Sequence, residues 1–309
     1  MSDHIAHLGI CDDVFRLAGM LPGLEPAFKA AMVEQREMAH MGAITRYADK
    51  WTVQLIRHAA DEMDKPEADR DANVRPKLAF TLGSLTHRAA DRLTKPITKC
   101  WQGVDASGVG SEANESKIIQ DVFVYREVYD SGKADELNLF SPLTLDLQDK
   151  LPGVASTEAL FRTLLRRALI AMHTFNPDPE NIHTWMDRFF QGIQQYPKSL
   201  EQYAKLHRDW DPALVKKYLT DKNFYQREDP LIQLARRIQH GESVEASAVV
   251  NAHEASDADH DTQRSRYERS LAKALDYLRA AEDWYHRRID QAEVTRRFDI
   301  GVPELSLRD

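Results

Sequence analysis

The sequence predicts an all-α protein, built as a compact multi-helix array rather than as a coiled coil. Apolar residues recur at three- and four-residue intervals through most of the 309 residues, which is the period of amphipathic helices. No stretch sustains the alternation of apolar and polar residues that a half-buried strand would show. Only 13 Gly and 13 Pro are present, so long loops and repeated β-turns are not expected.

The first half of the chain is expected to hold five helices. The charged loop 64–76 separates the third helix from the fourth, and the loop 102–113, which contains three glycines, separates the fourth from the fifth. Pro96 is expected to end the fourth helix, because a proline disfavours the helical conformation in the residue before it. These five helices are expected over residues 3–20, 24–40, 43–63, 75–95 and 114–131.

A second set of helices follows a boundary near residue 150, in the segment LPGVAST. We divide the chain into a metal-site helical region (1–150), a helical extension packed on it (151–240), a polar and mobile linker (241–261) and a long C-terminal helix with a tail (262–309). The helices of this second half are expected over residues 156–173, 180–195, 199–207, 211–219, 229–239 and 262–292.

The last expected helix, 262–292, carries a continuous apolar stripe. A stripe of this kind usually packs against its own chain, and self-association through the C-terminal helix is the alternative. The stripe consists of Tyr267, Leu271, Ala274, Leu275, Leu278, Ala281, Trp284 and Tyr285.

Composition limits the classes of function. The net charge of −8 argues against general binding of nucleic-acid backbones, which requires a basic face. Two cysteines, Cys11 and Cys100, are too few for a disulfide scaffold. No apolar run approaches the roughly 18 residues that span a bilayer. No signal peptide is visible at the N-terminus, so a cytoplasmic location is expected.

His87 and Asp91 are the leading candidates for a functional pair. They lie four residues apart in an expected helix, so the imidazole and the carboxylate share one face, one turn apart. Imidazole together with carboxylate suits zinc, and also iron or manganese. Gly83, one turn earlier, would let another element or a ligand approach closely. The alternative is a hydrogen-bonded pair on a helix surface, without a metal.

Neighbouring helices offer further ligands. Metal sites in helical enzymes are often built from one or two inward side chains on each of several helices. His7 shares a helical face with Cys11, which is expected to be a small buried residue. Asp12 and Asp13 are expected either to be surface charges or to complete a metal shell. The stronger candidates from the other helices and their junctions are His4, His40, Asp49 and Asp121.

The segment LAFTLGSLTHRAADRLTKP resembles the signature helix of the zinc-dependent phospholipase C family, whose superfamily includes single-strand-specific zinc nucleases. Leu82-Gly83, His87, Asp91 and Pro96 match the family pattern. A weaker match, HMGAI, begins at His40. The resemblance is most specific in the signature helix and diffuse over the rest of the first 130 residues, and the chain beyond residue 150 adds nothing to it.

The resemblance implies the helical fold of that family, with additional C-terminal helices, and a centre of one or two zinc ions. It implies that Asp91 bridges the metals and that one carboxylate among Asp12, Asp13 and Asp49 completes the shell or positions the attacking water. Thr98 and Lys117 stand where the family has further histidine ligands, which points to a reduced centre in a divergent member. The implied ligands are His4, His40, His87, Asp91 and Asp121.

The expected activity is hydrolysis of a phosphodiester or phosphomonoester by a metal-activated water. The substrate would be a small phosphoester or a phospholipid headgroup. One alternative is a non-catalytic helical scaffold or partner-binding protein that keeps the fold with a depleted metal site. The other is a different helical metalloenzyme, such as a phosphohydrolase that uses a His-Asp pair or a di-iron protein.

Overall fold

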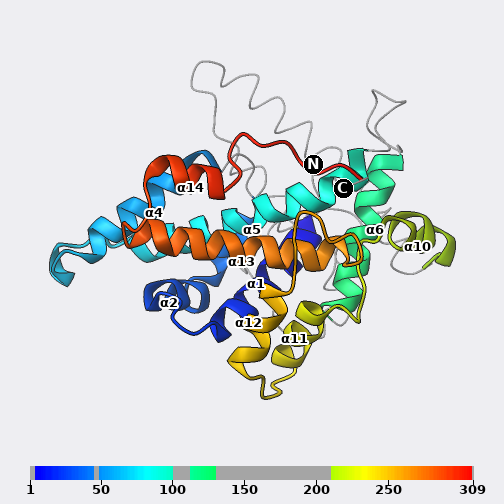
Figure 1. Cartoon of the computed structure of the whole chain (residues 1–309), viewed down its shortest axis with the longest axis horizontal. Helices are drawn as coiled ribbons and strands as arrows, with labels where there is room; N and C mark the ends of the chain where they lie inside the picture. The colour runs from blue at the N-terminus through cyan, green and yellow to red at the C-terminus, as the bar shows by residue number, and fades with distance from the viewer. Residues whose placement is uncertain (1–3, 45–48, 100–111, 130–209, 308–309) are drawn as a thin grey trace, which may run out of the picture.

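A computed structural model describes residues 4–44, 49–99, 112–129 and 210–307 of the chain (Figure 1). Within these ranges the chain forms eleven α-helices and no strand, so the predicted all-α class is confirmed. No helix in the described part of the chain is long enough and apolar enough to cross a membrane.

Part of the expected organisation lies outside the described residues. This applies to the boundary near residue 150 and to most of the helical extension 151–240. It also applies to three expected helices, over residues 156–173, 180–195 and 199–207.

The helices fall into two groups along the chain. The first comprises α1 (His4–Met20), α2 (Pro26–Glu34), α3 (Arg36–Ile44), α4 (Asp49–Met63), α5 (Val74–Lys99) and α6 (Glu112–Glu127). The second comprises α10 (Pro212–Tyr218), α11 (Pro230–Gln239), α12 (Ala246–Glu254), α13 (Arg266–Tyr285) and α14 (Gln291–Arg297). Two short 3-10 helices are also present: η1 (Glu67–Asp69) lies between α4 and α5, and η4 (Thr220–Lys222) lies between α10 and α11. The single helix expected over residues 24–40 is divided at Gln35 into α2 and α3.

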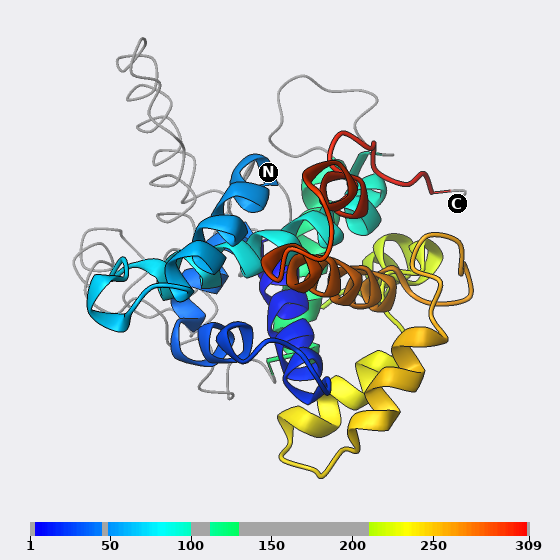
Figure 2. The same cartoon turned by 60° about the vertical axis from the view of Figure 1, so that its left-hand side comes forward.

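α1 is the central helix and lies in the middle of both views (Figures 1 and 2). Most of its apolar side chains are buried, as expected of a helix that is packed against several others. It contacts α5, α6, α11 and α13. His7, Asp12 and Asp13 of this helix are buried as well, so they must find their partners inside the protein.

α5 is the longest helix, and α3, α4 and α13 pack against it (Figure 1). The contact with α3 is a contact between backbones. A Cβ atom at Gly83 would lie 1.8 Å from the carbonyl oxygen of Ala39, and one at Gly42 would lie 1.9 Å from that of Phe80. The expectation that Gly83 admits a neighbouring element is therefore confirmed.

α5 does not end at Pro96, as the sequence led us to expect, but continues to Lys99. A proline inside a helix leaves the carbonyl group four residues earlier without its intrahelical donor. That carbonyl belongs to Arg92, and it accepts a hydrogen bond of 3.2 Å from the backbone N–H of Leu305. The end of the chain thus supplies the missing donor, which allows the helix to pass through the proline.

The segment 241–261 contains α12, which corrects the expectation of a polar linker. Val249 and His253 of this helix are buried, and His253 Nε2 lies 2.9 Å from Asp276 Oδ1 of α13. A helix of nine residues with so few buried positions shows no clear period within a polar stretch.

The long helix expected over residues 262–292 is observed as α13 and is shorter at both ends. Ser265 caps its start by accepting a hydrogen bond from the backbone N–H of Glu268, and Arg287, with a φ of 58°, follows its end. Every residue of the predicted apolar stripe is buried within the chain. The stripe therefore packs on its own body, and no described residue supports self-association through this helix.

Glu268, in the first turn of α13, is buried against the start of α11. Its Oε1 atom accepts a hydrogen bond of 3.1 Å from the backbone N–H of Leu231. Burial raises the pKa of Glu268 to about 7, and the nearby carboxylate of Asp229 adds to the increase. The folded protein therefore takes up a proton here that the unfolded chain has already released.

Glu268→Gln is expected to stabilise the protein at pH 8 by about 1–3 kcal/mol and to have a smaller effect at pH 5. The pKa of Glu268 in the folded state lies above its ordinary value of 4.5, so its contribution to stability is complete below that value and is lost as the pH rises through about 7. Urea unfolding at a series of pH values measures the difference. Glu254→Gln, at an exposed position, is the control and should show no such trend. Parallel profiles for the two variants would contradict the prediction.

Candidate metal centre

Three potential metal ligands, His7 of α1 and His87 and Asp91 of α5, meet where the two helices cross. One ligand atom from each residue lies within 4.8 Å of the other two. Asp91 Oδ1 is 3.3 Å from His7 Nε2, and Asp91 Oδ2 is 3.5 Å from His87 Nε2. The two imidazole rings lie side by side, with centroids 4.6 Å apart. A single cation could therefore take two nitrogen ligands and one carboxylate oxygen.

The ring of His87 is held in the orientation that a metal ligand needs. Its Nδ1 atom lies 2.9 Å from the carbonyl oxygen of Ala43, in the last turn of α3. A carbonyl oxygen can only accept, so this contact places a proton on Nδ1. Whenever the ring is neutral, its lone pair then resides on Nε2, the nitrogen that faces Asp91 and would bind a cation. The backbone contact between α3 and α5 at Gly83 is what brings Ala43 within reach.

The electrostatics of the site keep its carboxylate ionised. Both imidazoles are buried, and the Asp91 side chain is about one-fifth exposed. Burial acts to raise the pKa of Asp91, but the imidazoles of His87 and His7 outweigh it and hold that pKa well below its usual range. Lys95, one turn later on α5, places its Nζ atom 3.3 Å from Asp91 Oδ2. The site thus presents one carboxylate and two imidazole ligands, with the ammonium group of Lys95 beside them.

The described residues supply three ligands for a cation, which is fewer than a closed site needs. Structural sites are usually closed by four protein ligands, whereas catalytic sites combine three protein ligands with an open position. Here the described residues provide three, and the partly exposed edge at Asp91 gives access from solvent. A small molecule could approach the ion from that edge.

The structure brings together two of the predicted site residues, His87 and Asp91, and adds His7 to them. Two others lie elsewhere among the described residues. The Nε2 atom of His40 is 2.6 Å from Asp12 Oδ1, and Asp121 Oδ1 accepts a hydrogen bond of 2.9 Å from the backbone N–H of Ala6. His40 is thus occupied by another carboxylate, and Asp121 binds the start of α1.

The other residues that the sequence suggested as ligands or neighbours of the site are either undescribed or buried. The side chains of His4 and Asp49 lie outside the described residues, so their roles stay predictions. Cys11 is fully buried, as expected. Asp12 and Asp13 are not surface charges, because both are buried in the protein interior.

Among the described residues, the candidate ligand that α1 contributes is His7, which was not among the ligands predicted from the sequence. His4 and His7 are three residues apart on α1 and lie on the same side of the helix. Helical spacing alone therefore does not indicate which of the two is the ligand. The available signal was that His7 shares a face with Cys11, which was expected to be buried. A histidine on the buried face of a central helix is better placed for an internal site than one at the helix start.

Comparisons of this chain with known proteins found no match. No protein-family model matches the chain, and neither a curated protein nor a solved structure does. The resemblance to the zinc-dependent phospholipase C family therefore remains a prediction from the signature segment.

Proposed function

We propose that this chain is a metal-dependent hydrolase that acts on a phosphodiester or phosphomonoester at the site formed by His7, His87 and Asp91. The observation that carries the proposal is the convergence of two imidazoles and one ionised carboxylate, with an edge open to solvent. The sequence resemblance at His87 and Asp91 supports the same chemistry. A small phosphoester or a phospholipid headgroup is the proposed substrate class.

Each residue has a definite part in this proposal. His7 and His87 would hold the cation through their Nε2 atoms, and Asp91 would hold it through a carboxylate oxygen. A bound divalent cation such as zinc supplies a water of lowered pKa and offsets negative charge on the phosphoester. The carbonyl of Ala43 keeps His87 in the required tautomer. One zinc ion fits the described ligands, and the side chains of His4 and Asp49 are the candidates for holding a second.

The first test measures zinc content and hydrolysis together. The purified chain is expected to bind about one zinc and to hydrolyse bis-nitrophenyl phosphate, whereas His87→Ala and Asp91→Asn are expected to lose at least about tenfold in zinc affinity. His260→Ala and Asp221→Asn, which alter exposed residues, are the matched controls and should retain both properties. A zinc content below about 0.2 per chain that His87→Ala does not change would contradict the proposal.

A non-catalytic scaffold is the second candidate, and one observation favours it. Lys95 already forms an ion pair with Asp91, so the carboxylate has a cationic partner without any metal. In that case the group of His7, His87 and Asp91 would be a polar contact that joins α1 to α5. The zinc measurement separates the two candidates, because a structural contact predicts loss of stability in the variants without any zinc in the parent chain.

A further inference from the structure

We propose that Lys95 binds the anionic group of the substrate at this site, and that Glu304, in the C-terminal tail (residues 298–307), competes with the substrate for it. The inference rests on the proposed function and goes further, because it assigns a residue for substrate binding and a control element within the same chain. It follows from how the tail is attached to α5 and from where Glu304 is held.

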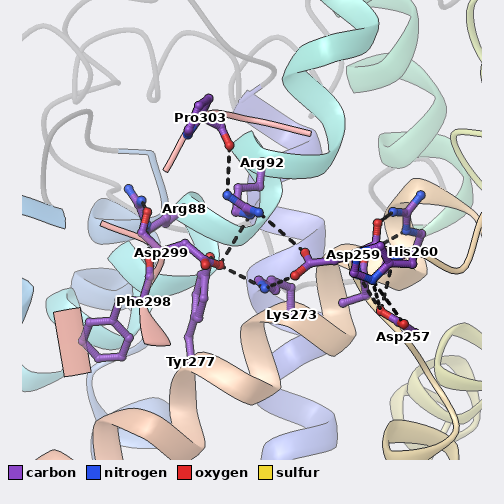
Figure 3. A network of polar contacts seen from close by, with 12 residues as sticks. Arg88, Arg92, Asp257, Asp259, His260, Lys273, Tyr277, Phe298, Asp299 and Pro303 are labelled. Atoms are coloured by element: carbon purple, nitrogen blue, oxygen red, sulfur yellow. Dashed lines mark hydrogen bonds and ion pairs between the residues drawn. The ribbon is translucent and has the colours of Figure 1, made fainter. Parts of the chain in front are cut away.

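The start of the tail is fixed to α5 by two arginines (Figure 3). Arg88 donates hydrogen bonds to the carbonyl oxygens of Phe298 and Asp299. One turn later, Arg92 Nη1 donates to the carbonyl oxygen of Pro303 at 2.9 Å. Because both arginines project from the helix that carries His87 and Asp91, the tail runs along that helix.

The carboxylate of Asp299 strengthens this attachment from the side of α13 (Figure 3). Its Oδ2 atom lies 2.9 Å from Lys273 Nζ and accepts a hydrogen bond of 2.9 Å from the hydroxyl of Tyr277. Arg92 Nε is 3.5 Å from the same oxygen. The tail is therefore held between α5 and α13 by several charged contacts, which fixes its course rather than leaving it free in solvent.

The next residues of the tail are held through the backbone. Pro96 leaves the carbonyl of Arg92 without an intrahelical donor, and the N–H of Leu305 takes that position. Arg266 of α13 donates to the carbonyl oxygen of Ser306 at 2.9 Å. Residues on both sides of Glu304 are thus anchored, so the position of Glu304 is defined by the backbone and not only by its own side chain.

Glu304 meets the site through Lys95. Its Oε1 atom lies 2.8 Å from Lys95 Nζ, and the same ammonium group is 3.3 Å from Asp91 Oδ2. Lys95 therefore bridges a candidate metal ligand and a carboxylate that comes from the far end of the chain. Glu304 and Lys95 are both partly exposed, so a solute can reach the contact.

Metal binding would change the balance of charge around Lys95. The cation would take up the negative charge of Asp91, and Lys95 would then be a second positive charge beside the metal. An ammonium group next to a divalent cation favours an oxyanion, and lysine binds phosphate as a point charge. Glu304 is an anion that already occupies this position. A phosphate group of the substrate that binds both cations therefore competes with the Glu304 carboxylate for Lys95.

The test titrates inorganic phosphate into the full-length, zinc-loaded chain at low ionic strength, by isothermal calorimetry. Glu304→Gln removes the competing charge and is expected to lower the dissociation constant about three- to fivefold. Lys95→Met removes the ammonium group and is expected to raise it at least about tenfold. Lys95→Arg keeps the positive charge and should retain most of the affinity. Zinc content is measured for every variant.

Glu242→Gln is the matched control, because Glu242 also pairs with a basic residue, Arg237, at 3.0 Å, and both residues are exposed. It should leave phosphate binding unchanged. Equal phosphate affinity in the parent, Glu304→Gln and Lys95→Met, with zinc still bound, overturns this inference and leaves the proposed function standing. Loss of zinc in Lys95→Met shows a purely structural role for Lys95 and overturns it too. Less than about 0.2 zinc per parent chain overturns both proposals.

Discussion

Gly83→Ala is expected to destabilise the protein by about 3–5 kcal/mol or to prevent folding, although alanine is the better helix former by about 1 kcal/mol. A Cβ atom at this position would lie 1.8 Å from the carbonyl oxygen of Ala39 and 2.7 Å from its carbon. Both atoms belong to the backbone of α3, so no side chain can move aside. The steric cost therefore exceeds the gain in helix propensity, and α3 would have to move away from α5.

The same movement is expected to weaken the candidate metal centre. Ala43, whose carbonyl oxygen accepts the hydrogen bond from His87 Nδ1, lies one turn after Ala39 on α3. Urea unfolding and zinc content should therefore both respond to Gly83→Ala. Gly19→Ala is the control, because a Cβ atom at Gly19 of α1 would meet nothing within 4 Å. It should leave stability unchanged or raise it by up to about 1 kcal/mol. Equal stability of the two variants would contradict the close approach of α3 to α5.

The helical class could be predicted because it depends on a local property, the spacing of apolar residues along each segment. The same argument placed the stripe of α13, all of which is buried. The limits of the helices depend on contacts between distant parts of the chain. α5 continues past Pro96 because Leu305 donates to the carbonyl of Arg92, and nothing near Pro96 in the sequence indicates this. α12 was missed because its burial depends on neighbours such as Asp276 of α13.

The candidate site was likewise predictable only where it depends on local spacing. His87 and Asp91 could be predicted, because their spacing places both on one face of one helix. Which third residue joins them depends on how α1 crosses α5, and this crossing brings in His7. The pairing of His40 with Asp12 was likewise hidden, since both residue types are typical metal ligands and the sequence does not show that they satisfy each other.

Asp12→Ala is expected to destabilise the protein by about 3–5 kcal/mol, because Asp12 is the shared acceptor of a buried polar cluster. Its Oδ1 atom is 2.6 Å from His40 Nε2 and accepts a hydrogen bond of 3.1 Å from Arg36 Nε. Its Oδ2 atom accepts a hydrogen bond of 2.7 Å from the hydroxyl of Tyr129. Removing the carboxylate would leave these three groups without their common partner. Asp221→Ala is the control, since Asp221 pairs with an exposed lysine and should contribute less than about 1 kcal/mol.

The pH dependence of stability and the zinc content together show whether Asp12 is a structural carboxylate or a metal ligand. Burial acts to raise the pKa of Asp12, but His40 and Arg36 outweigh it and hold that pKa well below its ordinary value of 3.8. The contribution of ionised Asp12 to folding stability is therefore complete above a pH of 3.8 and is lost as the pH falls below it. The difference in the free energy of unfolding between the parent and Asp12→Asn should narrow below about pH 4. Asp12 pairs with His40 and not with the candidate metal ligands. The zinc content of Asp12→Asn should therefore equal that of the parent, whereas Asp91→Asn should lose zinc. Loss of zinc in Asp12→Asn would place Asp12 and His40 in the metal centre and contradict the structural assignment.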